Sequence, residues 1–275
     1  MSYDIFIFKE DNIMEVYLQA ISGWDDAITS MYMTKGNWTP ELGDQIHKEC
    51  DFTFDRRGRL RHYKDYLLLS PEEKDLRDKC LNRISSLFRF GRRHITMMRF
   101  LDFSFVVTGL HRGAQDDWDA HEHRFNSRII RLSTRIGAMK NAVNNGKDIQ
   151  LSDFYKDKVM TLSEVLDYLN IDIPNEIEKD GKTFVRSING YVDKDNESYD
   201  VKRGLYPLGL SSAFIFKCNL CEYPHVRSLR RRKTEGFPES GHAHPELWDL
   251  VDEIDRILIG EIPALTSDWL DEVKQ

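Results

Sequence analysis

Two apolar stretches that lie far apart in the chain constrain its fold more than any other feature. Residues 100–108 (FLDFSFVVT) and 211–218 (SSAFIFKC) are rich in aromatic and β-branched side chains, which favour β-strands. Gly109 is expected to end the first strand. The sequence predicts helices around these strands, at 70–90, 110–145, 161–170, 221–233 and 243–260. Strands and helices in one chain that has no internal repeat predict an α+β fold.

The helix at 70–90 has the clearest start signal. Ser70-Pro71-Glu72-Glu73 places a serine at the N-cap, a proline at the first helical position and a glutamate at the third. Thr161 and Glu164 have the spacing of a capping box at the helix over 161–170. Both helices are therefore expected to begin at these residues.

The remaining segments give weaker signals. Residues 3–8 (YDIFIF) predict a short strand, and residues 12–35 have partly helical periodicity that ends near Gly36. Loops or inserted segments are predicted at about 40–65, 171–200 and 231–242, and the second of these is turn-rich and hairpin-like. The chain has no internal repeat and no Pro/Gly/Ser-rich linker, so we expect a single domain over residues 1–275.

The composition is that of a folded, soluble protein, with 40% hydrophobic and 31% charged residues. No apolar run approaches the roughly 18 residues that a membrane span requires. The first residues lack the basic and apolar segments of a secretory signal. The four cysteines are too sparse for a disulfide framework. We therefore expect a cytoplasmic protein with no membrane partner.

The charge distribution limits the possible ligands. The net charge of −7 argues against broad nucleic-acid binding, which depends on releasing counterions from phosphates. Arginine and lysine nevertheless crowd into four segments, at 55–62, 88–99, 124–135 and 227–233. Local basic clusters in an acidic chain suit a small anionic ligand, because arginine can bind phosphate oxygens through two parallel hydrogen bonds.

Cysteine and histidine pairs raise two further hypotheses. Cys218 and Cys221 form a CxxC, which we interpret as two ordinary cysteines at a strand end, because a zinc site needs a second ligand pair and a redox site needs a thioredoxin-like context. Two HxH pairs, His121/His123 and His242/His244, could serve a metal-dependent hydrolase. Alternate residues of a helix point in different directions, however, so a helix would not hold both histidines of a pair on one metal, and no residue is assigned as a metal ligand.

Four short blocks, taken in chain order, carry a family resemblance. They are His94-Ile95-Thr96 with FLDFSF, His123-Arg124-Phe125 with Ser133-Thr134-Arg135, Arg203-Gly-Leu-Tyr-Pro207-Leu, and Asn219 with His225, Leu229-Arg230 and Ala243-His244-Pro245-Glu246-Leu247. In this order and with this spacing they resemble the flavin-dependent thymidylate synthases, which methylate dUMP with a reduced flavin. The resemblance covers roughly residues 85–137 and 198–262.

The resemblance implies an α+β domain with a mixed or antiparallel sheet flanked by helices, assembled as a homotetramer. It implies methylation of a pyrimidine nucleotide at C5, dUMP to dTMP or a close variant, with FAD as cofactor and NADPH and methylenetetrahydrofolate as co-substrates. The implied nucleotide-binding residues are Ser133, Arg135, Arg203 and Arg230, of which Ser133 and Arg230 are also catalytic. The implied flavin-binding residues are His94, Thr96, His123, Arg124, Asn219 and His225.

The chain also departs from the family pattern, mainly on the flavin side. The family's R-H-R motif corresponds to His123-Arg124-Phe125, or in another alignment to Ala120-His121-Glu122. Arg99 stands where the family often has glutamate, Cys221 where it often has arginine, and His244 where it usually has glutamine. A nucleotide-binding homologue without flavin chemistry is therefore the alternative hypothesis, and the metal-dependent phosphohydrolase is a further one.

Overall fold

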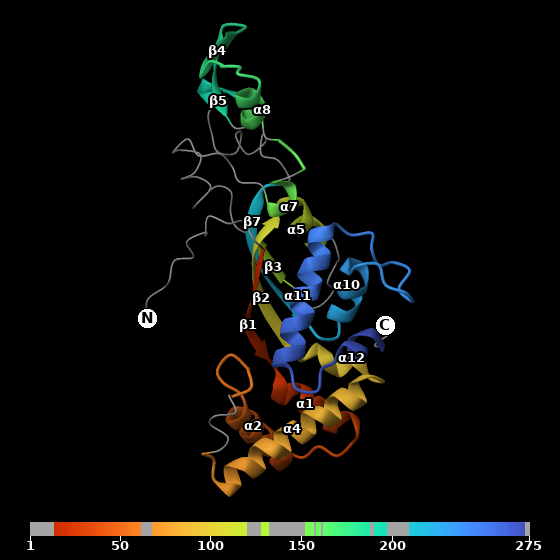
Figure 1. Ribbon diagram of the computed structural model, residues 1–275. Helices are drawn as coiled ribbons and strands as arrows, with labels where there is room; N and C mark the ends of the chain where they lie inside the picture. Colours follow the sequence, from red (N-terminus) through yellow and green to blue (C-terminus); the bar gives the residue numbers. More distant parts are fainter. Residues whose placement is uncertain are drawn as a thin grey trace. The chain divides into compact units, whose positions relative to one another are not determined.

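The computed structural model of the protein describes residues 14–61, 68–119, 128–131, 152–156, 158–160, 162–187, 190–196 and 209–272 (Figure 1). The chain divides into two compact units. The first unit comprises Met1–Glu15, Val107–Asp116 and Arg131–Phe214, and the second comprises Val16–Val106, Asp117–Ile130 and Ile215–Gln275. The predicted strand at 3–8 lies outside the described residues.

Four strands from different parts of the chain form one sheet with the order β1-β2-β7-β3. Its strands are β1 (Glu15–Ser22), β2 (Asp102–His111), β7 (Ser211–Asn219) and β3 (Arg128–Arg131). The two strands expected at 100–108 and 211–218 are confirmed, and so is the α+β class. Gly109 does not end β2, because glycine adopts its positive φ of 82° without a steric clash and the strand continues to His111.

Alternation along β2 and β7 places one row of side chains in the core. Phe103 and Phe105 on β2 and Phe216 on β7 are almost fully buried, and the rings of Phe105 and Phe216 stack with centroids 5.6 Å apart. Phe103 meets the ring of Tyr223 edge-on at 5.4 Å, which ties β2 to the helix that follows β7. The β-branched and aromatic composition that predicted these strands therefore also forms the core between them.

Three helices from the C-terminal part complete this layer of the second unit. They are α10 (Tyr223–Arg230), α11 (Pro245–Glu261) and α12 (Ser267–Glu272). In Figure 1, α11 lies beside α10, which it contacts. Its buried residues recur at helical spacing, with Leu247, Leu250, Val251, Ile254 and Leu258 on one face. The helices expected at 221–233 and 243–260 are therefore confirmed, joined by the predicted polar loop.

A cluster of three helices, α1 (Trp24–Thr34), α2 (Pro40–Thr53) and α4 (Pro71–Gly91), forms the rest of the second unit (Figure 1). The interpretation of 12–35 as helical was wrong for its first part, where β1 ends before α1. Gly23 allows this turn, because it has a φ of 83° and a Cβ there would lie 1.9 Å from the carbonyl oxygen of Phe100.

Helix α2 corrects the prediction of a loop at 40–65. Thr39 caps it by accepting from the backbone N–H of Leu42, and Pro40 occupies its first position. The segment is polar because only one face is buried, including Ile46 and Cys50. A low apolar content therefore concealed an amphipathic helix whose start signal resembles the one at Ser70.

Helix α4 begins with the predicted capping box. Ser70 Oγ accepts from the Glu73 backbone N–H at 3.3 Å, and the Glu73 carboxylate accepts from the Ser70 backbone N–H at 2.7 Å. The helix ends at Gly91, which leads into the 3₁₀ helix η1 (Ile95–Arg99). A Cβ on Gly91 would lie 2.4 Å from Met98 Cε, so a glycine lets η1 pack closely against the end of α4.

The first unit contains a small antiparallel sheet with the order β4-β5-β6. Its strands are β4 (Glu176–Lys179), β5 (Lys182–Ser187) and β6 (Gly190–Asp193), followed by η2 (Lys194–Asn196). Asp180 and Gly181 join the first two strands with φ angles of 55° and 73°, as a tight hairpin turn requires. The hairpin-like interpretation of 171–200 is therefore confirmed.

Three short helices lie near the unit boundaries and in the first unit. They are α5 (Arg112–Asp119), α7 (Asp153–Lys156) and α8 (Leu162–Tyr168). The helix expected at 161–170 is confirmed as α8, although Thr161 of its capping box lies outside the described residues. The helix expected at 110–145 was wrong at β3, where the β-branched pair Ile129-Ile130 belongs to a strand.

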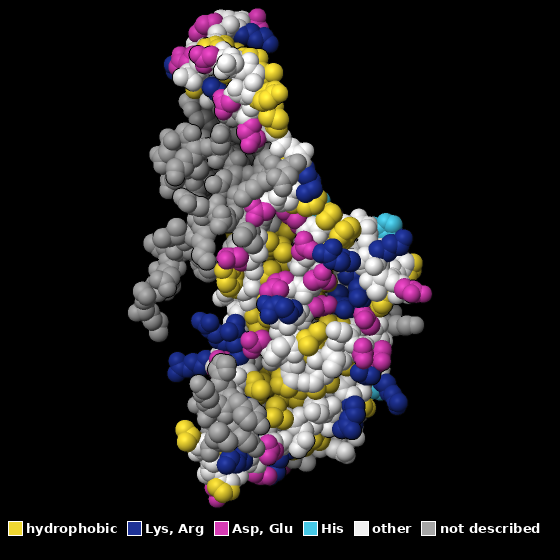
Figure 2. All heavy atoms as spheres, viewed as in Figure 1, with side chains coloured by type: hydrophobic (Ala, Val, Ile, Leu, Met, Phe, Trp, Pro, Cys, Tyr) yellow, Lys and Arg dark blue, Asp and Glu magenta, His cyan; other side chains and the backbone are white. Residues whose placement is uncertain are grey.

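The surface is mixed in charge. Figure 2 shows basic and acidic side chains interspersed over the face in view, with apolar side chains among them. Several apolar side chains of the first unit near α8 are exposed, including Leu162, Tyr168 and Leu169. Among the helices that the structure describes, none has the length and apolar character that crossing a membrane needs.

Candidate functional site

His94 and Thr96 lie where α4 passes into β2. His94 caps η1, Thr96 lies within it, and both side chains are exposed. The imidazole of His94 packs against the ring of Phe90, with centroids 4.6 Å apart and planes tilted by 37°. Both side chains are thus held at the surface by a short rigid element, where they can contact a ligand.

Asn219 ends β7 and shapes the start of α10. It is fully buried, and its Oδ1 accepts hydrogen bonds from the backbone N–H groups of Cys221 and Glu222, each at 3.0 Å. These bonds pair backbone donors in the turn into α10, and the Glu222 N–H also donates to the Asn219 backbone carbonyl at 3.2 Å. Asn219 therefore positions the helix that carries His225, which is exposed, and Arg230.

Arg230 is the last residue of α10 and is largely buried. Its Nη2 donates to the backbone carbonyl of Asp117 at 2.5 Å, and the Asp117 carboxylate lies 3.7 Å away. Its Nε is buried and has no hydrogen-bond partner among the described residues. Burial lowers the pKa of Arg230, and the charge of Asp117 only partly opposes this. An arginine with an unused buried donor is suited to receive a ligand oxygen.

The neighbouring arginines of the 227–233 cluster serve the fold instead. Arg227 donates to Asp255 at 2.6 Å and to Asp271 at 2.5 Å, and Arg231 donates to Asp271 at 2.5 Å. Tyr223 also donates to Asp255, at 2.6 Å. These bonds join α10 to α11 and α12. Of these three arginines, Arg230 is therefore the candidate for binding a phosphate.

Charge in this network is perturbed by burial. Burial raises the pKa of the Asp255 carboxyl, with Arg227 opposing the shift, and it raises the pKa of Tyr223 well above its ordinary value. For Asp271 burial alone would raise the pKa, but hydrogen bonds from Arg227 and Arg231 outweigh it and lower the pKa. Such internal compensation is typical of a structural ion network.

Cys218 and Cys221 are buried thiols that form no disulfide, at the end of β7 and just after it. Burial raises the pKa of the Cys221 thiol, while a hydrogen bond from Arg99 acts in the opposite direction. Arg99, on η1, thus lies against the segment that leads into α10. Arg99 and Cys221, two of the positions at which the chain departs from the family pattern, are therefore in contact with each other.

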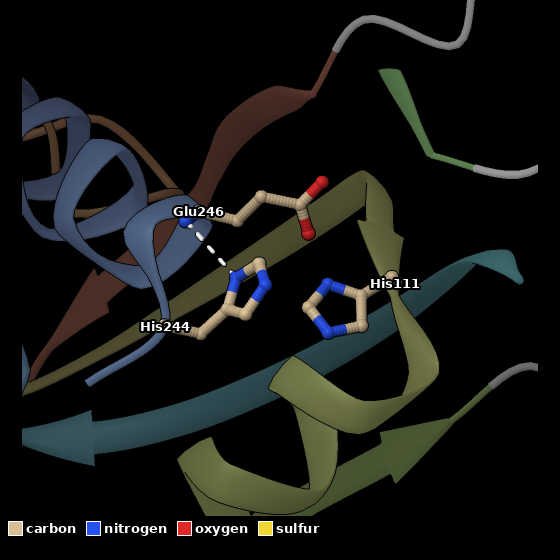
Figure 3. Close-up of side chains that lie close together, drawn as sticks. All are labelled: His111, His244 and Glu246. Atoms are coloured by element: carbon tan, nitrogen blue, oxygen red, sulfur yellow. Dashed lines mark hydrogen bonds between the residues drawn. The ribbon is translucent and has the colours of Figure 1, made fainter. Parts of the chain in front are cut away.

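His244 and Glu246 lie at the start of α11 (Figure 3). The His244 Nδ1 accepts from the backbone N–H of Glu246 at 3.2 Å, so this histidine caps the helix. His111, also drawn in Figure 3, ends β2, and its ring meets that of Tyr155 edge-on at 5.1 Å. His242 is exposed, and His121 and His123 lie outside the described residues, so the metal-hydrolase hypothesis stays a prediction.

Most of the predicted nucleotide side of the site lies outside the described residues. This applies to Ser133, Arg135 and Arg203, and on the flavin side to His123 and Arg124. Within the second unit the structure places His94, Thr96, Asn219, His225 and Arg230 on η1, at the end of β7 and on α10.

Comparison with solved structures places the fold. No protein-family model and no curated protein matches the chain. The crystal structure of thymidylate synthase X (ThyX) from Helicobacter pylori with FAD and dUMP superimposes with a TM-score of 0.50 at 17% sequence identity, and the match covers 94% of this chain and 99% of that chain. The chain has the ThyX fold.

A second structure of ThyX from H. pylori, complexed with FAD and dUMP, matches with a TM-score of 0.46 at 15% identity, over 94% of this chain and 98% of that one. The ThyX fold agrees with the resemblance drawn from the four sequence blocks.

Proposed function

We propose that the protein methylates a pyrimidine nucleotide at C5, converting dUMP to dTMP or carrying out a close variant of that reaction, with FAD, NADPH and methylenetetrahydrofolate. The observation that carries the proposal is that the family-like blocks occur in order on a chain with the ThyX fold. A chain unrelated to this family would not be expected to have both the ThyX fold and the family's sequence blocks in order.

The described residues on the flavin side fit FAD. His94 and Thr96 offer an imidazole and a hydroxyl at the surface of η1. Arg99 contacts Cys221, so a cation remains at the point where the resemblance implies that an arginine has been lost. FAD carries phosphates, which guanidinium groups bind well. When bound and reduced by NADPH, the flavin would supply the hydride for the methylation.

On the nucleotide side we assign Arg230 the role of polarising the pyrimidine. Its unpaired Nε can donate to a carbonyl or phosphate oxygen without breaking the bond from its Nη2 to Asp117. A buried guanidinium stabilises negative charge that develops on the ring, since little solvent screens it there. Ser133, Arg135 and Arg203 would complete the nucleotide site, with Ser133 and Arg230 as catalytic residues.

Other residues complete the proposal. His123, Arg124 and His225 would contact the flavin. Asn219 would hold the start of α10 in place, and so position His225 and Arg230. We further propose a cytoplasmic homotetramer, as the resemblance implies.

The experiment is a turnover assay. Purified protein is incubated with dUMP, FAD, methylenetetrahydrofolate and NADPH, and dTMP is measured by mass spectrometry, with a reaction lacking the protein as control. Formation of dTMP that requires all four additions supports the proposal. If labelled dUMP binds but no methylated product forms in any reaction, the proposal is wrong.

The second candidate is a nucleotide-binding homologue without flavin chemistry. The observation that favours it is the sequence His123-Arg124-Phe125 at the place of the family's R-H-R motif, which changes the residue types on the flavin side. In that case calorimetry would show dUMP binding with unchanged affinity whether or not FAD is present, and no FAD binding.

A further inference from the structure

A basic hollow lies at the end of α4, next to His94. It has a volume of about 410 Å³ and opens to the solvent. The described residues that line it are Lys35, Ser86, Arg89, Phe90, Arg93 and His94, and none of them is acidic. Lys35 comes from the end of α1, whereas the other side chains come from the last turns of α4 and the residues that follow it.

The cations of this basic hollow are not neutralised within the described part of the chain. Lys35, Arg89 and Arg93 make no ion pair there with a carboxylate. Arg89 donates to Ser86 Oγ at 3.4 Å, and Lys35 Nζ lies 4.5 Å from the centroid of the Phe90 ring. By contrast Arg92, the sequence neighbour of Arg93, pairs with Glu272 at 2.5 Å and does not line the hollow.

The helix dipole explains only part of this arrangement. Cations near a helix C-terminus are favourable, and Arg89 and Arg93 lie at the end of α4. Lys35 benefits from the same effect at the end of α1, but the dipole of neither helix explains why both helix ends present their cations to the same hollow. Like charges that converge from two elements repel each other, so the arrangement costs free energy unless an anion binds between them.

The ring of Phe90 contacts two side chains of the basic hollow, those of Lys35 and His94. Its ring lies below Lys35 Nζ and also packs against the imidazole of His94. Cation–π attraction to this ring restricts an otherwise flexible lysine. The half-buried ring therefore organises the basic hollow before a ligand arrives, which reduces the entropy lost on binding.

We propose that the basic hollow is a binding site for a multiply charged anion, either a di- or triphosphate group or a polycarboxylate. Two guanidinium groups can each donate two hydrogen bonds to such a group, and the ammonium of Lys35 adds a third charge. The hollow is large enough for a small ligand. Because His94, which lines the hollow, is also an implied flavin-binding residue, the inference rests in part on the proposed function. The probes contain no flavin or nucleotide, so anion binding here is measured independently of flavin binding and turnover.

The test is isothermal titration calorimetry on the full chain at low ionic strength. The probes are pyrophosphate and tripolyphosphate, with citrate as the carboxylate arm. Wild-type protein is compared with Arg89→Gln/Arg93→Gln and, separately, with Lys35→Gln. Arg92→Gln is the matched control, since it removes one charge from the same segment outside the hollow. Circular dichroism confirms that each variant is folded.

We expect at least one probe to bind the wild-type protein and the double variant to bind it at least about tenfold more weakly, as the loss of charge-assisted hydrogen bonds predicts. Lys35→Gln should weaken binding to a smaller extent, and Arg92→Gln should leave it unchanged. The probe that binds more tightly identifies the phosphate or the carboxylate source. The proposal is overturned if no probe binds, if the double variant binds as tightly as the wild type, or if Arg92→Gln causes the same loss.

The variant Phe90→Leu distinguishes the effect of the aromatic ring on anion binding from the effect of the positive charges. It removes the ring that holds Lys35 and His94 but keeps an apolar side chain and every cation. Weaker binding of the same probe by Phe90→Leu, with an unchanged dependence on salt, supports the preorganised site. Binding that is indifferent to Phe90→Leu and to both charge variants contradicts it.

Discussion

Arg230 donates a hydrogen bond to the backbone carbonyl of Asp117, while its buried Nε has no partner in the described part of the chain. The residue is therefore anchored and still able to bind. Its neighbours Arg227 and Arg231 lack this property, because carboxylates of α11 and α12 occupy them. Arg230 is thus a candidate for ligand binding, whereas Arg227 and Arg231 are structural.

Arg230→Lys tests the assigned role of this guanidinium. Lysine keeps the positive charge but cannot hold Asp117 with one nitrogen while it offers another to a ligand. We expect dUMP affinity to fall about tenfold or more, in line with the loss of a hydrogen bond to a charged group. Calorimetry measures the Kd, and Arg232→Lys, at an exposed position on the same segment, should leave it unchanged. An unaltered Kd in Arg230→Lys would show that the nucleotide does not use this residue.

Arg99→Gln tests whether this arginine supplies the cation on the flavin side. The change removes a charge beside Cys221 without altering the size of the side chain greatly. FAD binding, followed by fluorescence quenching, should weaken by about tenfold. Arg92→Gln is the comparison, since it is a similar change on an exposed arginine outside η1. Equal FAD affinity in both variants would exclude Arg99 from the flavin site.

Arg227→Met should destabilise the protein strongly. The side chain is 5% exposed and pairs with Asp255 and Asp271, so its removal leaves carboxylates without their buried partner. Breaking a buried pair from one side costs about 3–5 kcal/mol of the free energy of unfolding. Arg232→Met, whose partners Asp249 and Asp252 are more than half exposed, should cost less than about 1 kcal/mol. Urea unfolding of the two variants gives the comparison, and similar losses would contradict the structural role of Arg227.

His47 predicts a pH dependence of stability. Its hydrogen bond to Asp25, at 2.9 Å, and the charge of Asp51 raise its pKa above the ordinary value of about 6.5. The folded state therefore favours the protonated imidazole. This contribution is fully present below the ordinary pKa and is lost as the pH rises through the raised pKa of the folded state. The effect is small because the pair is exposed.

The measurement for His47 is the urea midpoint of wild-type protein and His47→Gln at a series of pH values across the histidine titration. The wild type should lose more stability than His47→Gln as the pH rises. The same slope for both proteins would show that this histidine does not contribute.

The sequence predicted those elements whose formation depends on neighbouring residues in the chain. The start of α4 followed from Ser70 and Glu73, because a capping box involves only neighbours in sequence. The strands β2 and β7 followed from their aromatic and β-branched content. Helix α2 was missed because the polar residues around Ile46 suggested a surface loop, although the Thr39-Pro40 start signal was present.

The site was less predictable, because its contacts join distant segments. The sequence singled out Arg230, but its bond to Asp117 spans more than a hundred residues and follows from the fold alone. The crowding of arginine in 88–99 was visible, whereas the approach of Lys35 to that segment was not. Arg99 and Cys221 were both noted as departures, yet their contact required the structure.

The absorption spectrum of the untreated purified protein is the most direct measurement. If the protein is a flavin-dependent methyltransferase, the preparation shows the visible flavin bands or acquires them when FAD is added, and dUMP perturbs them. A preparation that shows no flavin bands and binds no added FAD, while it remains folded by circular dichroism, would contradict the proposed function.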